Sequence, residues 1–171
     1  MKFLKYLLLV FCVTSCAPIY VNYDYEKATN FSEYKTYNFF SNIESGLNGL
    51  DEKRLISALE IKLNAMGLER TENASFFIDI KSEEFESSSN STVGLGVGGG
   101  YSGVSVGIPF GKTNINKQIT IEFVDESKTG LFWQATSECS FKQNQKPEKR
   151  ELRFQAIVEK MLEGFPPETN K

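Results

Sequence analysis

Two neighbouring stretches of strict alternation constrain the fold of this chain more than any other feature. In residues 118–124 the apolar positions are Ile119, Ile121 and Phe123. In residues 131–141 the alternate positions are Leu131, Trp133, Ala135, Ser137, Cys139 and Phe141. A period of two places each set on one face of a strand, and the polar residues 125–130 between them suit a turn. The pattern predicts an antiparallel pair with one apolar face, which other elements must cover.

Two segments with helical periodicity can supply that cover. The stripe in residues 51–66 consists of Leu55, Leu59, Leu63 and Met66, widened by Ile56 and Ala58. The stripe in residues 147–162 consists of Phe154, Ile157 and Met161, widened by Val158 and Leu162. We expect Asp51 to cap the first helix and Gly67 to end it, and Pro147 to begin the second. Both helices therefore have one face to bury.

Three further segments, residues 19–25, 31–40 and 76–80, also alternate and predict strands. The order is strand, strand, helix, strand, glycine-rich segment, strand, strand, helix. Helices on one face of a largely antiparallel sheet would bury both patterns at once. We therefore predict an α+β two-layer sandwich, formed by residues 16–171 as a single domain with two helices on one face.

The N-terminus has the pattern of a lipoprotein signal peptide. Lys2 and Lys5 precede an apolar run at residues 6–13, which is much shorter than the roughly 20 residues needed to cross a bilayer. The run ends in Val13-Thr14-Ser15-Cys16, which resembles the lipobox of bacterial lipoproteins. We expect residues 1–15 to be removed and Cys16 to carry a diacylglyceryl thioether and a further acyl chain such as palmitate. Cys16 as a structural cysteine in a weak N-terminal helix is the alternative.

This lipidation predicts a location in the bacterial cell envelope, with the lipid on Cys16 as the contact with the membrane. By resemblance to the sorting rules of such lipoproteins, Ala17 favours the outer membrane. No acidic cluster follows directly, which favours a domain that faces the periplasm.

A glycine-rich segment spans residues 93–111 and alternates apolar residues with glycine and serine. Its apolar positions are Val93, Leu95, Val97, Tyr101, Val104, Val106 and Ile108. The segment partly matches two nucleotide-binding motifs, but neither match is followed by the helix that such sites need. We expect a glycine-rich hairpin or loop: a flexible excursion, a hairpin folded over the sheet, or an interaction segment for self-association or an envelope partner.

Charge and composition exclude several function classes. Without residues 1–15, which contain Lys2 and Lys5, the formal net charge is 17 minus 22, or −5, which argues against nucleic acid as a partner and against electrostatic adhesion to anionic lipid. The chain contains no histidine, which excludes Ser-His-Asp catalysis and imidazole-based zinc sites. We expect no cofactor, no metal site and no nucleotide. Glu83, Glu84 and Glu86 suggest a solvated acidic loop, with an Asp/Glu-dependent hydrolase as the weaker alternative, and Cys139 suggests a buried, inert thiol.

Several stretches together resemble the bacterial lipoproteins of domain of unknown function 4136. These are Val21-Asn22-Tyr23-Asp24-Tyr25, Phe31-Ser32-Glu33-Tyr34-Lys35-Thr36-Tyr37, Leu63-Asn64-Ala65-Met66-Gly67-Leu68, Gly130-Leu131-Phe132-Trp133 and Phe165-Pro166-Pro167. The resemblance covers most of the chain after residue 16 and implies an envelope lipoprotein without catalytic residues. We therefore expect a membrane-anchored, non-enzymatic binding or scaffold module. The alternative is a binder of a small apolar ligand or lipid between the sheet and the helices.

Overall fold

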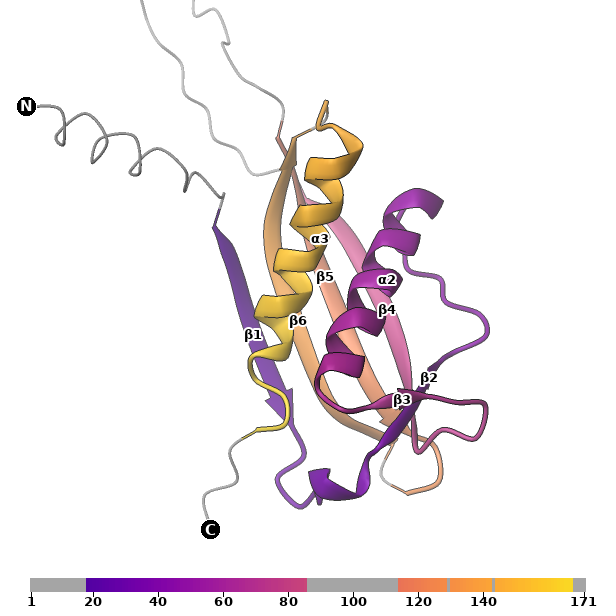
Figure 1. Ribbon diagram of the computed structural model, residues 1–171. Coiled ribbons are helices and arrows are strands. Elements are labelled where there is room, and N and C mark those ends of the chain that lie inside the picture. Colours follow the sequence, from indigo (N-terminus) through magenta and orange to yellow (C-terminus); the bar gives the residue numbers. More distant parts are fainter. Residues whose placement is uncertain (1–17, 86–113, 129, 143, 168–171) are drawn as a thin grey trace, which may run out of the picture.

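The computed structural model describes residues 18–85, 114–128, 130–142 and 144–167 (Figure 1). Along the chain, the elements are β1 (Ile19–Tyr25), the 3-10 turn η1 (Phe31–Glu33), β2 (Thr36–Phe39), α2 (Gly49–Ala65), β3 (Glu69–Arg70), β4 (Phe76–Phe85), β5 (Asn114–Asp125), β6 (Gly130–Lys142) and α3 (Pro147–Leu162). The strands form one sheet in the order β1-β6-β5-β4-β2-β3.

The sheet is mixed but largely antiparallel. The β1, β6, β5 and β4 neighbours pair antiparallel, whereas β2 pairs parallel with both β4 and β3. Parallel neighbours need a crossover, and α2 provides it between β2 and the strands that follow. Both helices lie on the same face of the sheet (Figure 1). The predicted α+β two-layer sandwich is therefore confirmed.

The core lies between the helices and the sheet, and aromatic side chains dominate it. The largest side chains with almost no exposed surface include Trp133, Tyr37, Phe76, Phe123, Phe132, Phe141 and Phe154. The predicted helical stripes are buried as expected at Leu55, Leu59, Leu63, Phe154, Ile157 and Met161. Gly67 has φ +84° directly after α2, where a side chain would be strained, and this confirms it as the stop of that helix.

A β-bulge breaks the alternation predicted for the last strand. Trp133 lies opposite Phe123, but Leu131 lies opposite the next residue, Val124, so that Phe132 is an extra residue in β6. An extra residue in a strand places the side chains beyond it on the opposite face of the sheet from the one that strict alternation predicts. Phe132 therefore points into the core with Trp133, while Leu131 is 45% exposed. The prediction was right from Trp133 to Phe141 and wrong for Leu131.

Two strands are longer than the sequence predicted. β4 continues to Phe85, where we expected a loop from Glu83, and β5 begins at Asn114 rather than near Gln118. The two strands pair as far as Phe85 opposite Asn116. The polar residues of these extensions alternate between the two faces of the sheet at a solvated end, which is why the sequence there resembles a loop. The glycine-rich segment 93–111 lies outside the described residues.

One end of the domain, which we call the helix-start end, gathers the beginnings of several elements. Both helices begin there, and so does β1, because Ile19 pairs with Cys139 near the end of β6 (Figure 1). The last residue of β6, Lys142, pairs with the first of β5, Asn114. The polar groups described next lie at this end.

Candidate functional site

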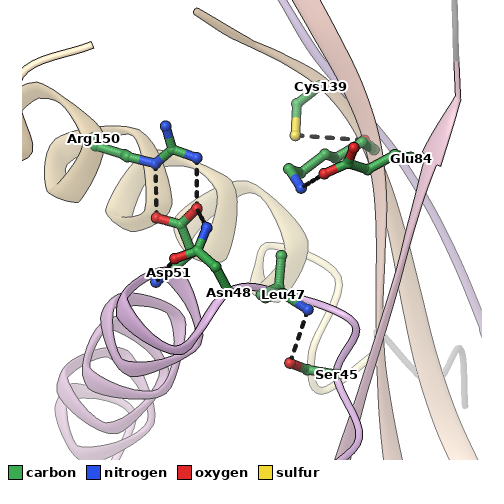
Figure 2. A network of polar contacts seen from close by, with 8 residues as sticks. Ser45, Leu47, Asn48, Asp51, Glu84, Cys139 and Arg150 are labelled. Carbon is green, nitrogen blue, oxygen red and sulfur yellow. Dashed lines mark hydrogen bonds and ion pairs between the residues drawn. The ribbon is translucent and has the colours of Figure 1, made fainter. Parts of the chain in front are cut away.

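A buried carboxylate at the helix-start end is the centre of the densest polar network. Asp51, in the first turn of α2, has no exposed surface. Its carboxylate accepts hydrogen bonds from Arg150 Nε at 2.7 Å and Nη2 at 2.5 Å (Figure 2). It also accepts a hydrogen bond from Arg54 Nη1 at 2.9 Å. Asn48 Nδ2 donates a further bond at 2.7 Å. We call Asn48, Asp51, Arg54 and Arg150 the helix-start cluster.

Local sequence explains how the cluster forms. Asn48, not Asp51 as we predicted, is the N-cap of α2: its Oδ1 accepts from the Asp51 backbone N–H at 3.1 Å. This leaves the Asp51 side chain free to turn towards α3. Arg150 lies in the first turn of α3, where a cation is disfavoured by the helix dipole, and the carboxylate compensates it. The Arg150 guanidinium also lies 5.5 Å from the centre of the Phe141 ring.

The electrostatic balance of the cluster favours the charged carboxylate. Burial alone would raise the pKa of Asp51, but the hydrogen bonds from Arg150 and Asn48 outweigh it and hold the pKa below its ordinary value. The carboxylate is therefore ionised at neutral pH with its acceptor sites occupied. Such a group ties two helices together, and its lowered pKa makes it a weaker proton acceptor than an ordinary aspartate.

A second ion pair lies beside the cluster, on the helix-facing side of the sheet. Lys117 is only 3% exposed and pairs with Glu84 across β4 and β5 (Figure 2). The Cys139 thiol lies 3.7 Å from the Lys117 carbonyl oxygen, to which it donates. Burial raises the pKa of this thiol to about 11, so that it stays protonated at physiological pH. The predicted burial of Cys139 is confirmed, and its low reactivity stays a prediction.

The acidic residues that we singled out do not converge. Glu83 and Glu84 are adjacent in β4, so their side chains point to opposite faces of the sheet. Glu84 is occupied by Lys117, and Glu86 lies outside the described residues. Within the described part of the chain, no three His, Cys, Asp or Glu residues gather as metal ligands would. Within the described ranges, Glu83 and Glu84 therefore do not form the paired carboxylates that glycoside hydrolysis requires.

The remaining predicted site residues cannot be placed. Cys16 precedes the first described residue, Pro18, and Val93, Leu95, Val97, Tyr101, Val104, Val106 and Ile108 lie outside the described ranges. Sequence reasoning also missed the helix-start cluster, although the Asn48-x-x-Asp51 spacing is a known capping signal. The partnership of Asp51 with Arg150 has no local signal, since 99 positions separate them.

A cavity of about 660 Å³ lies at the opposite end of the domain. We call it the Phe31 cavity. Its lining comes from three connections: the stretch around η1, the end of α2 and the turn after α3. Among the lining residues are Phe31, Lys35, Met66, Leu68, Phe165 and Pro166. Its volume falls in the range of small-molecule sites, and its walls are partly apolar.

The chain belongs to a known protein family: the model of a family described as a domain of unknown function (DUF4136) matches residues 21–167. No curated protein sequence is similar enough to count as a match. A PDZ domain protein from Parabacteroides distasonis has a similar structure, with a TM-score of 0.56 and 15% identity over 97% of this chain. This chain spans only 40% of that protein's length.

A second structural neighbour is PelC from Paraburkholderia phytofirmans, solved as a dodecamer. Two crystal forms give TM-scores of 0.50, at 15% and 14% identity, over 85% of this chain and 95% of PelC. At such identities the likeness concerns the fold alone. It shows that this arrangement of strands and helices occurs in proteins of unrelated description.

Proposed function

We propose, from the premise that this chain belongs to the DUF4136 family, that it is a membrane-anchored lipoprotein of the cell envelope. In this proposal its domain is a non-enzymatic binding or scaffold module that faces the periplasm, and the lipid on Cys16 holds it at the outer membrane. None of the described helices has the length and apolar character to cross a bilayer. Attachment through a lipid is thus the mode that the N-terminal sequence supports.

The observation that carries the proposal is how soon the folded domain begins after Cys16. Ile19 is already in the sheet, opposite Cys139. The Pro18 carbonyl oxygen accepts a hydrogen bond from Arg153 Nη2 of α3 at 3.3 Å. Only Ala17 stands between this contact and the lipid acceptor. This is the arrangement expected of a domain that follows its processed cysteine directly.

A non-enzymatic role is supported by the state of the polar groups at the helix-start end. Asp51 and Lys117 are buried and paired, and the Cys139 thiol is protonated. General acid–base catalysis needs a group whose pKa lies near the working pH and which can reach a substrate. The lowered pKa of Asp51 and the raised pKa of Cys139 both lie away from neutrality, and both groups are buried, so binding is better supported than catalysis.

The anchor is tested by intact-mass analysis of protein made in a bacterial host. We expect the chain to begin at Cys16 and to carry the mass of a diacylglyceryl group and a further acyl chain. Cys16→Ser should abolish both the added mass and membrane fractionation, whereas Cys12→Ser should change neither, since Cys12 leaves with the signal peptide. A bare Cys16 thiol, or an uncleaved leader, would refute the proposal.

The scaffold role is tested by crosslinking in intact cells. We expect crosslinks to an envelope partner, or to a second copy, through residues 93–108. Deleting that segment should remove them while the remaining domain still folds, as circular dichroism can show. Unchanged crosslinks and an unchanged envelope phenotype after the deletion would exclude the segment as the contact.

A second function, binding of a small apolar ligand, is supported by the Phe31 cavity. The space between the sheet and helices, where we first expected such a ligand, is filled by side chains such as Trp133 and Phe123. Native mass spectrometry of the protein with lipid extracts would test this function. Retained ligand should be lost in Ser32→Trp, which narrows the cavity, but kept in Ser57→Trp, which lies on α2 outside it.

A further inference from the structure

We propose that the corner between β6 and α3 faces the bilayer and binds anionic phospholipid headgroups through Lys142, Lys146 and Lys149. This inference rests on the proposed lipid anchor at Cys16. It adds an orientation of the domain and a second contact with the membrane, made by protein side chains.

The chain between the lipid acceptor Cys16 and the folded domain is short. Pro18 is held against α3 by Arg153. A fully extended chain spans at most about 3.6 Å per residue, so Cys16 lies within roughly 7 Å of Pro18. The lipid therefore keeps the helix-start end, where β1 begins, close to the membrane surface. The far end of β1 points away from it, because β1 is a single straight strand (Figure 1).

The register of the sheet places the end of β6 beyond the start of β1. Ile19 lies opposite Cys139, and the antiparallel strand β6 continues from there to Lys142. Three residues of strand cover about 10 Å. Lys142 and the start of α3 thus extend beyond the first residue of β1 at the helix-start end (Figure 1). The corner is placed between the body of the domain and the bilayer.

The corner between β6 and α3 carries exposed lysine side chains. Lys142, Lys146 and Lys149 are exposed, and among the described residues none of them forms an ion pair. Glu148 is the single acidic residue between positions 142 and 149. Of the other described acids nearby, Asp51 is paired with Arg150 and Glu84 with Lys117, whereas Glu151, one turn of α3 beyond Glu148, is exposed. Among the described residues of the corner, three exposed lysines therefore outnumber the two exposed acids, Glu148 and Glu151.

The acids on the open face of the sheet are too far away to cancel this charge. Glu83 and Glu138 both lie opposite Gln118, and so occupy one row across the sheet. Glu138 precedes Lys142 by four residues, or about 13 Å along the strand. This exceeds the Debye length of about 8 Å at physiological ionic strength. The described residues of the corner therefore carry a local positive charge, although residues 16–171 as a whole carry 17 minus 22, or −5.

The expected strength follows from the number of lysines. A basic residue near an anionic leaflet favours contact by about 1 kcal/mol, or roughly fivefold. Three such residues would favour the corner-down orientation by on the order of 100-fold in a membrane with anionic lipid. The lipid on Cys16 supplies the attachment, so this preference needs only to orient a domain that is already at the surface.

The test uses the natively acylated full chain, reconstituted in vesicles of phosphatidylethanolamine with phosphatidylglycerol. A fluorophore is placed in Lys146→Cys and, as the reference, in Lys27→Cys, which follows the far end of β1 some 26 Å from Ile19. We expect the label at position 146 to be several-fold better protected from an aqueous quencher than the label at 27. High salt should reduce the difference.

Charge dependence is tested in the Lys146→Cys background. Adding Lys142→Gln and Lys149→Gln should weaken the orientation by on the order of 25-fold, since each lysine contributes roughly fivefold. The matched control, Lys27→Gln with Lys35→Gln, removes two exposed lysines from the opposite end and should leave the protection unchanged. Vesicles of phosphatidylcholine alone should behave like the lysine-depleted protein.

The outcomes separate this inference from the proposed function. Equal quenching at 146 and 27 in protein that is acylated and stays on the vesicles would overturn the inference and leave the anchor intact. Protection that persists in detergent would also overturn it, because the cover would then be a second copy of the chain. Protein that lacks the acyl mass and washes off the vesicles would instead refute the anchor.

Discussion

The contacts of the helix-start cluster predict that Asp51→Asn destabilises the folded domain. Asp51→Asn keeps the size of the side chain but removes its charge, and replaces one acceptor oxygen by a donor group. The Arg150 and Arg54 guanidinium groups, which lie 2.5–2.9 Å from the carboxylate, would then face a neutral amide. Asn48 Nδ2, at 2.7 Å, would meet either a weaker acceptor or a second donor.

The magnitude follows from burial on the two sides of the pair. Breaking a fully buried ion pair costs about 3–5 kcal/mol, because a charge is left without compensation. Here the Asp51 side chain has no exposed surface, but those of Arg54 and Arg150 are 20% and 19% exposed and can turn partly to water. We therefore expect a loss of about 2–3 kcal/mol at neutral pH, which lowers the melting temperature by roughly 5–10 °C for a domain of this size.

The pH dependence provides a sharper test than the size of the effect. The arginine and asparagine partners hold the pKa of Asp51 below its ordinary value despite burial. An acid with a lowered pKa stabilises the fold above the unfolded value of about 3.9, and this contribution is lost as the pH falls towards the folded value. The difference between the native chain and Asp51→Asn, measured by urea unfolding, should thus shrink as the pH is lowered from 7 to 3.

The control is Glu33→Gln at an exposed ion pair with Lys128, whose side chains are both about half exposed. Solvent screens an exposed pair of this kind, so this variant should be nearly neutral. The double variant Asp51→Asn with Arg150→Gln should regain part of the loss, since it removes the uncompensated cation. A difference for Asp51→Asn that stays below about 1 kcal/mol at pH 7, or is constant between pH 7 and 3, would refute the reasoning.

Three further perturbations test particular contacts. Gly46→Ala should lower the free energy of unfolding in urea by more than about 1 kcal/mol. Gly46 has φ +70°, and an added Cβ would lie 2.7 Å from a carbonyl oxygen of β4. Gly49→Ala, where an added Cβ would meet nothing within 4 Å, should leave the free energy of unfolding nearly unchanged. The Cys139 thiol, with its pKa raised to about 11, should resist iodoacetamide at pH 8 until the protein unfolds, and rapid alkylation in the native state would contradict its burial. Gly164→Ala should destabilise the edge of the sheet, because its Cβ would lie 2.7 Å from the Tyr23 ring, and Tyr23→Ala should relieve this in a double-variant cycle.

Periodicity in the sequence was sufficient to predict both helices, the main strands and the layer arrangement. Apolar residues at helical or alternating spacing have one face to bury, and this information is local. The bulge at Phe132 escaped prediction because a run of Leu131, Phe132 and Trp133 is apolar at every position. Alternation then gives no signal as to which of the three side chains points outward.

The polar site was less predictable for a related reason. Asp51 has the residue type and position of a helix cap, and only the arrival of Arg150 from the other helix gives it a different role. The short strand β3 and the parallel pairing of β2 likewise depend on partners that are distant along the chain. Contacts of this kind are decided by the assembled fold, whereas caps and stripes are decided within a few residues.

The position of β1 has a consequence for how the chain reaches its native state. Among the described strands β1 pairs with β6 alone, so that Tyr25 must meet Trp133 and Ile19 must meet Cys139. A segment made early in synthesis therefore waits for one made near the end, and closing so long a loop is slow. We expect the first strand to dock last, onto a nucleus of α3 and the β4–β5–β6 meander, and the N-terminal edge to show the earliest hydrogen exchange.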